Sequence, residues 1–155
     1  MNSNDEEIRS ADGTRLLVRR AGAGDPVVLL HGSGGGLHSS ASVAARLAGS
    51  YELWMPARRG YGPSDVPEGR KSFKDDVADL LAVVETIGRP VHLVGGSYGA
   101  TLALHMAAAE QSRLQSLAVF GPPLFAAGSR SRHCSTAMRP SSGRTRVRCL
   151  PCSTT

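Results

Sequence analysis

The sequence contains no long hydrophobic run, since no stretch approaches the roughly eighteen consecutive apolar residues that a membrane-spanning helix needs. Its first residues, MNSNDEEIRS, are polar and acidic, whereas a secretory signal requires a basic end followed by an apolar run. We therefore expect no membrane association and a cytoplasmic location. With 155 residues, 41% of them hydrophobic, the chain is long enough for one globular domain with a buried core.

Acidic residues are missing from the last part of the chain. All thirteen Asp and Glu residues and twelve of the eighteen Lys and Arg residues lie in residues 1–125, which therefore carry a net charge of −1. The other six basic residues are arginines in residues 126–155. Arginines of this number could contact phosphates, but no aromatic residues are interleaved among them. An unselected basic tail is the favoured interpretation, and we expect no nucleic-acid binding.

Cysteine is scarce, and its three copies all lie in the same tail, at Cys134, Cys149 and Cys152. An odd number of cysteines in a chain without a secretory signal argues against a disulfide framework. Pro151 lies between the last two, and no second pair of ligands accompanies them, so we expect no metal site and no cofactor. Residues 126–155 have no apolar periodicity and are predicted to be irregular or disordered.

Residues 1–125 have the pattern of one α/β domain. A short strand–turn–strand with Gly13 in the turn precedes four apolar runs that are typical of buried strands. Segments with helical spacing alternate with these runs. The predicted later strands are 27–30, 51–55, 91–94 and 114–120, and the predicted helices are 38–48, 72–87 and 101–109. This order predicts a doubly wound, mainly parallel sheet with right-handed crossovers.

The most informative motif is Gly-x-Ser-x-Gly, in which Gly95 and Gly99 flank Ser97. It lies between a predicted buried strand and a predicted helix, which is the context that a nucleophilic serine in a sharp turn needs. The glycines leave room for a strained backbone, and the N–H of Tyr98 at the start of the helix would donate to an oxyanion. The alternative interpretation is a tight structural loop between strand and helix.

A second glycine-rich loop follows the predicted strand 27–30. Its sequence, HGSGGG, begins at His31 and includes Gly32. Such a loop can direct a backbone N–H, that of Ser33 or else that of Gly34, towards the same oxyanion. In open α/β sheets both loops would lie at the carboxyl ends of the strands, where ligands bind. The alternative interpretation is a flexible linker.

Three motifs in order, LLHGSG at 29–34, RGYGPSD at 59–65 and GGSYG at 95–99, resemble successive signatures of the α/β-hydrolase superfamily. The resemblance covers roughly residues 8–125. It implies a partial α/β-hydrolase fold, a small-molecule acyl substrate, Ser97 as nucleophile, and an oxyanion hole formed by the amides of Ser33 and Tyr98. Serine at this position resembles the esterase, thioesterase, peptidase and carbon–carbon hydrolase branches. The loop 59–65 is interpreted as structural, with Arg59 paired to a carboxylate.

The resemblance also implies a catalytic acid and histidine after later strands, and neither is visible. No acidic residue follows Glu110, and the only later histidine is His133. His31, His92 and His105 are interpreted as structural; His38 is the least implausible substitute base, and His133 is no better. We therefore expect a truncated or frameshifted hydrolase that is catalytically incomplete and marginally stable. Two alternatives are a natural minimal protein with a basic tail and a non-catalytic remnant that binds a small ligand.

Overall fold

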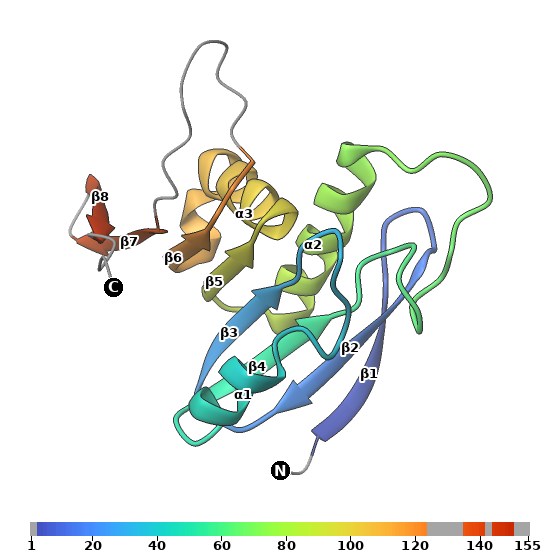
Figure 1. The fold of residues 1–155 in the computed structure, drawn as a ribbon, viewed down its shortest axis with the longest axis horizontal. Coiled ribbons are helices and arrows are strands. Elements are labelled where there is room, and N and C mark those ends of the chain that lie inside the picture. The colour runs from blue at the N-terminus through green and yellow to red at the C-terminus, as the bar shows by residue number, and fades with distance from the viewer. Residues whose placement is uncertain (1–2, 124–134, 142–143, 151–155) are drawn as a thin grey trace.

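The computed structural model describes residues 3–123, 135–141 and 144–150, which form one eight-stranded sheet of order β1-β2-β4-β3-β5-β6-β7-β8 (Figure 1). The strands are β1 (Ser3–Arg9), β2 (Arg15–Ala21), β3 (Asp25–Leu30), β4 (Tyr51–Pro56), β5 (Val91–Gly96), β6 (Leu114–Phe120), β7 (Ser135–Ser141) and β8 (Arg144–Leu150). The helices are α1 (Ala41–Leu47), α2 (Phe73–Ile87), α3 (Tyr98–Ala109) and the 3-10 turn η1 (Gln111–Arg113).

The sheet formed by β1 to β6 is mostly parallel, as predicted. Strands β4, β3, β5 and β6 run parallel to one another, and β3 pairs with β5 so that Leu30 lies opposite Gly95. The hairpin β1–β2 adds two antiparallel strands next to β4. Since Leu30 and Gly95 lie near the carboxyl ends of neighbouring parallel strands, the loops that follow β3 and β5 leave the sheet side by side.

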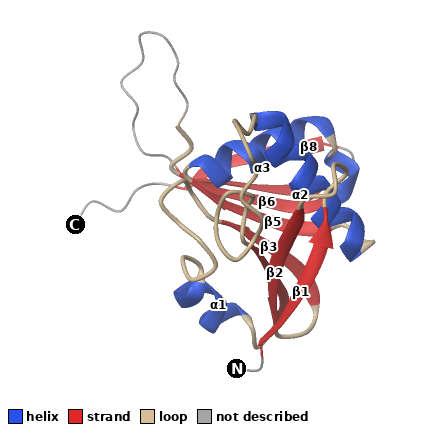
Figure 2. Cartoon of the chain, turned by 90° about the vertical axis from the view of Figure 1, so that its right-hand side faces the viewer, coloured by secondary structure: helices blue, strands red, loops and turns tan. Residues whose placement is uncertain are grey.

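Helices cover both faces of the sheet, which confirms the doubly wound arrangement (Figure 2). Alternate residues of β3 show the consequence, because successive side chains of a strand point to opposite faces. Val28 and Leu30 belong to the larger core cluster together with residues of α2 and α3. Val27 and Leu29 belong to a second cluster, which includes Ala44 of α1. The strand is therefore buried on both faces, as its continuous apolar sequence predicts.

Local signals set the ends of α2. Ser72 and Asp75 form a reciprocal capping box at its start, and Gly88 ends it with a left-handed φ of 71°. Helix α1 is shorter than the predicted 38–48. Its preceding turns explain this, because the N–H groups of Ser39 and Ala41 bond to carbonyls three residues earlier.

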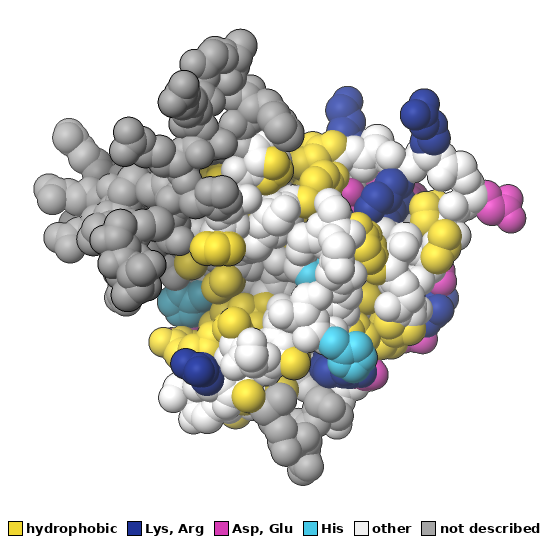
Figure 3. Space-filling model, in the orientation of Figure 1, with side chains coloured by type: hydrophobic (Ala, Val, Ile, Leu, Met, Phe, Trp, Pro, Cys, Tyr) yellow, Lys and Arg dark blue, Asp and Glu magenta, His cyan; other side chains and the backbone are white. Residues whose placement is uncertain are grey.

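Charged side chains gather on the side of the molecule formed by the hairpin β1–β2 and the loop before α2 (Figure 3). Arg15 of β2 shows how these segments are tied together. Its guanidinium forms ion pairs with Glu7 of β1, at 3.0 Å, and with Asp65 of the loop, at 3.2 Å. These partly exposed pairs connect the N-terminal hairpin to the loop that leads into α2.

Two stretches of the segment 126–155 are strands among the described residues, since β7 pairs antiparallel with β6 and β8 pairs antiparallel with β7. The predicted irregular tail otherwise lies outside the described residues. An exposed sheet edge offers a row of unpaired backbone groups, so pairing can order a chain that lacks apolar periodicity. The three cysteines belong to this segment, and Cys134 and Cys152 lie outside the described residues.

Candidate active site

Ser97 lies at a sharp turn between β5 and α3. Its φ of 51° makes it the only non-glycine residue with positive φ in the part of the chain that the structure describes. The N–H of Ser97 donates to the carbonyl oxygen of Phe120, at 2.9 Å, which fixes the turn to the end of β6. The side chain is exposed. Such a backbone costs about 1–3 kcal/mol, and strained residues of this kind cluster at functional sites.

Close backbone contacts explain the glycines on either side of Ser97. A Cβ at Gly95 would lie 2.4 Å from the carbonyl oxygen of Gly99, and a Cβ at Gly99 would lie 2.5 Å from that of Leu30. Both distances are far shorter than any non-bonded contact. The motif therefore lets the start of α3 approach the ends of β3 and β5.

The loop after β3 contacts the side chain of Ser97. A Cβ built on Gly32 would lie 3.0 Å from the Cβ of Ser97 and 3.6 Å from its Oγ. Glycine at this position therefore allows the loop to approach Ser97 more closely than a residue with a side chain would. The two glycine loops that the sequence singles out thus meet at Ser97, and the next residues, Ser33 and Gly34, are exposed.

Hydrogen bonds to its carbonyl groups hold this loop. The carbonyl oxygen of Ser33 accepts from the hydroxyl of Tyr61, at 2.6 Å. The carbonyl oxygen of Gly32 accepts from the N–H of Gly35, at 3.2 Å, and lies 2.8 Å from Nδ1 of His31. Because the carbonyl and N–H of one trans peptide point in opposite directions, these bonds also orient the amides of the following residues.

His31 is a structural residue of this loop. Its Nε2 accepts the backbone N–H of Arg58, at 3.2 Å, so the Nδ1 nitrogen near Gly32 carries the proton. Burial lowers the pKa of His31, and the charges of Arg58 and Lys71 lower it further, against the opposing effect of the bond to Gly32. The ring is therefore neutral, and both of its nitrogens are engaged.

A buried polar cluster beneath the loop was not predicted. Its centre is Asp76 of α2, whose Oδ1 forms ion pairs with Arg58, at 3.4 Å, and Lys71, at 3.3 Å. The Oδ2 of Asp76 accepts the hydroxyl of Tyr98, at 2.8 Å. Burial and this hydrogen bond raise the pKa of Tyr98 to about 12, so its hydroxyl remains a donor.

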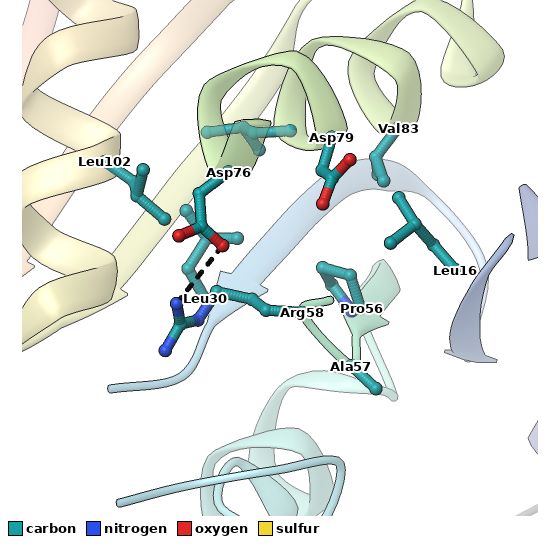
Figure 4. A pocket seen from close by; sticks show the side chains of 10 residues that line it. Leu16, Leu30, Pro56, Ala57, Arg58, Asp76, Asp79, Val83 and Leu102 are labelled. Carbon is teal, nitrogen blue, oxygen red and sulfur yellow. Dashed lines mark hydrogen bonds and ion pairs between the residues drawn. The ribbon is translucent and has the colours of Figure 1, made fainter. Parts of the chain in front are cut away.

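A cavity of about 10 Å³ lies behind this cluster, between α2 and the sheet (Figure 4). Arg58, Asp76 and Asp79 supply its polar lining, and the rest is mostly aliphatic. A space of this size is about that of one water molecule. The cavity is therefore too small for an acyl substrate, which would have to bind on the open side of Ser97.

The loop 59–65 braces the fold, and the prediction that Arg59 pairs with a carboxylate is confirmed. The buried guanidinium of Arg59 bonds to both oxygens of Asp79, at 2.7 and 2.6 Å, and to Asp12 of the β1–β2 turn, at 2.8 Å. Ser64 accepts from the N–H of Leu17 and donates to the carbonyl of Ala57. The motif thus joins the hairpin, β4 and α2.

No hydrogen bond joins Ser97 Oγ to a histidine or a carboxylate within the described residues. His92 bonds to Ser116, at 2.7 Å, and His105 contacts the edge of Phe73, so both are occupied elsewhere. His38 is exposed and has no bond to Ser97, and His133 lies outside the described residues. Among the described residues, therefore, no histidine or carboxylate is hydrogen-bonded to Ser97 Oγ.

The described residues contain no group of three or more His, Cys, Asp or Glu side chains that could hold a metal ion. Among the same residues, no helix combines the length and apolar character that crossing a bilayer requires.

Comparison with known proteins identifies the family. A family model described as the alpha/beta hydrolase fold matches residues 25–138, which include both glycine loops and Ser97. The chain belongs to this family. A solved α/β hydrolase from Sphaerobacter thermophilus is similar in structure, with a TM-score of 0.71 and 34% sequence identity, over 76% of this chain and 45% of that one. The N-terminal half of the hydrolase fold is therefore what the described residues form.

Two curated enzymes of the family are similar in sequence. The 2-hydroxymuconate semialdehyde hydrolase of Pseudomonas sp. (strain CF600) is 31% identical over 118 residues, covering 72% of this chain and 41% of that protein. The pimeloyl-[acyl-carrier protein] methyl ester esterase of Aeromonas salmonicida is 34% identical over 113 residues, covering 72% of this chain and 44% of that protein. The chain thus spans about two fifths of the length of these relatives.

Proposed function

We propose that this chain carries the nucleophile of a serine hydrolase that acts on small acyl substrates, with Ser97 as the attacking residue. One observation carries the proposal: Ser97 is exposed and holds a φ of 51° at the junction of β5 and α3, beside the side-chain-free Gly32. A strained, accessible serine in this setting is poised for attack on a carbonyl.

Two backbone amides are suited to stabilise the oxyanion. The N–H of Tyr98 is at the start of α3, where the first N–H groups have no acceptor within the helix and the helix dipole favours negative charge. The N–H of Ser33 belongs to the same peptide group as the carbonyl of Gly32. His31 and Arg58 contact that carbonyl oxygen, so they lie on the opposite side of the peptide from the Ser33 N–H. The N–H of Gly34, paired in the same way with the carbonyl of Ser33, is the substitute.

The chemistry of the attack defines the substrate class. Ser97 Oγ would form a bond to an acyl carbon, the hydroxyl proton would pass to a base, and the leaving group would depart with a proton. Esters, thioesters, amides and carbon–carbon bonds next to a carbonyl all fit this step. The names of the two curated relatives, a methyl ester esterase and a semialdehyde hydrolase, support this range.

Because no described base contacts Ser97, we infer that the catalytic triad is incomplete in this chain and that its turnover is slow. Residual catalysis by the oxyanion hole alone is about 10³-fold over water in the best-studied serine proteases. Covalent labelling by a phosphonylating probe, which needs no later deacylation step, is then a better assay than turnover. The expected cytoplasmic location and the lack of nucleic-acid binding stay predictions.

The test is labelling of the full chain with an alkyl fluorophosphonate, followed by intact-mass spectrometry and peptide mapping. We expect one adduct, on Ser97, and no adduct in Ser97→Ala. Ser33→Ala is the matched control, because it removes an exposed hydroxyl in the same site and keeps the backbone N–H. Equal labelling of the wild type and Ser97→Ala would remove Ser97 from the mechanism.

A second candidate function is ligand binding without chemistry. The absence of a histidine or carboxylate bonded to Ser97 Oγ among the described residues favours it. Ligand-observed NMR with a short-chain methyl ester distinguishes the two. Binding that is equal in the wild type and Ser97→Ala, with no fluorophosphonate adduct in either, would support a binding remnant in place of an enzyme.

A further inference from the structure

Arg58 is a buried cation that the proposed chemistry does not yet use. Only 5% of its side chain is exposed, and its guanidinium carbon lies over two aromatic rings, 4.7 Å from the centroid of Tyr61 and 4.6 Å from that of Tyr98. Its Nη1 faces Asp76, and its Nη2 donates to the carbonyl oxygen of Gly32, at 3.2 Å. One flat side chain thus contacts both segments that flank Ser97.

Fold stability alone does not account for an arginine here. Its Nε is buried and has no hydrogen-bond partner among the described residues. An unpaired buried donor costs free energy, and the cost of removing one member of a buried ion pair comes mainly from the charge that is left without a partner. Asp76 would retain Lys71 and the Tyr98 hydroxyl without Arg58. The guanidinium is therefore better explained by what it orients.

The group that it orients is the peptide between Gly32 and Ser33. The carbonyl of this peptide accepts from Arg58 Nη2, in addition to its contacts with His31 Nδ1 and the Gly35 N–H within the loop, so the Ser33 N–H at its other end points away from the guanidinium. Tyr98 links the two proposed oxyanion donors, because its ring contacts Arg58 while its own N–H begins α3. A change at Arg58 would therefore reach both donors.

We propose that Arg58 is a positioning residue, which holds the Gly32–Ser33 peptide in the orientation that directs the Ser33 N–H towards the oxyanion formed at Ser97. The inference rests on the proposed function of Ser97. A guanidinium suits this task because it is planar, stacks on aromatic rings and offers several donors in fixed directions. A lysine ammonium at the same place is a point charge without that geometry.

The first measurement is the second-order rate of fluorophosphonate labelling in the wild type, Arg58→Met and Arg58→Lys. We expect both variants to react about tenfold to a hundredfold more slowly, because a small misplacement of a catalytic donor costs this much. Lys71→Met is the matched control. It removes the other cation on Asp76 but has no contact with Gly32, so we expect its rate to stay within about threefold of the wild type.

The second measurement is independent of the chemistry. In ¹H–¹⁵N spectra we expect the Ser33 amide to shift and to exchange faster with solvent in Arg58→Met and Arg58→Lys. We expect it to change much less in Lys71→Met, because Lys71 contacts the ring of Tyr61 and does not bond to Gly32. If the wild type is never labelled at Ser97, the proposed function fails, and the amide spectra still judge Arg58. The inference would be overturned if Arg58→Met folds, is labelled at the wild-type rate and has an unchanged Ser33 amide. If Arg58→Met does not fold, the same result in Arg58→Lys would overturn it.

Discussion

Gly95 faces the backbone of Gly99 so closely that a Cβ at position 95 would lie 2.4 Å from the Gly99 carbonyl oxygen. Because the obstacle is backbone that is held at the start of α3, it cannot move aside as a flexible side chain would. We expect Gly95→Ala to lower the free energy of unfolding by about 3 kcal/mol or more. Urea unfolding, followed by the fluorescence of the single tryptophan, Trp54, measures the change.

Gly96 is the matched control for this prediction. It is the next residue of β5, its φ is not positive, and no atom lies within 4 Å of a Cβ built on it. We expect Gly96→Ala to change the free energy of unfolding by less than about 1 kcal/mol. Similar losses in the two variants would show that the close approach of β5 and α3 is not what selects glycine at position 95.

The strain at Ser97 predicts that replacing this residue by glycine stabilises the fold. A non-glycine residue in such a conformation costs about 1–3 kcal/mol. Glycine removes this strain, but its greater entropy in the unfolded chain offsets the gain by about 1 kcal/mol or less. We expect Ser97→Gly to be about 1 kcal/mol more stable than Ser97→Ala, which keeps the Cβ. Both variants lose the hydroxyl, so urea unfolding of the pair isolates the strain. A less stable Ser97→Gly would contradict it.

Most of the fold was predictable because its signals are local. The apolar run 114–120 coincides with β6, and Ser72 and Gly88 cap α2 where the sequence predicts its ends. The start of α1 was placed too early, because the turns of the preceding loop take the amides that a helix would use. Strand β7 pairs with the edge of β6, and β8 pairs with β7; the first of these contacts is distant in sequence, and composition does not predict it.

The site divides in the same way. The motif around Ser97 lies on consecutive residues, so its turn and its meeting with the Gly32 loop were predictable. The cluster of Arg58, Asp76 and Tyr98 was not, because its members come from three elements and lie 18 and 22 residues apart. One signal was present: Asp76 and Asp79 fall on the same helical stripe as the buried Leu80 and Val83. Acidic residues on the buried face of a helix indicate that basic or hydrogen-bonding side chains are buried beside them.

The neighbouring arginines are expected to differ in their effect on stability. Arg59→Met would leave the buried Asp79 without its bidentate partner, and we expect the free energy of unfolding to decrease by about 3–5 kcal/mol. Arg58→Met leaves Asp76 paired with Lys71, and we expect a change of about 1 kcal/mol or less. Urea unfolding of the two variants is the measurement.

A double variant tests the cause. If the loss in Arg59→Met comes from a stranded charge, then adding Asp79→Leu removes that charge and restores much of the stability. Additive losses from the two substitutions would instead indicate that each side chain acts through its own packing.

The neutral His31 predicts a loss of stability in mild acid. Its folded-state pKa is lowered by burial and by the charges of Arg58 and Lys71, below the ordinary value of 6.5. The unfolded chain therefore binds a proton that the folded state resists, so the contribution of His31 is complete above about pH 6.5 and decreases as the pH falls from there towards the lowered pKa. We expect urea unfolding at about pH 7.5 and pH 5.5 to give a smaller difference in His31→Gln than in the wild type. If the difference in unfolding free energy between the two pH values were the same in His31→Gln as in the wild type, another group would be responsible for it. Carboxylates such as Asp12 and Asp75, whose pKa values are lowered by hydrogen bonds, stay ionised in both states over this range and leave the comparison to the histidines.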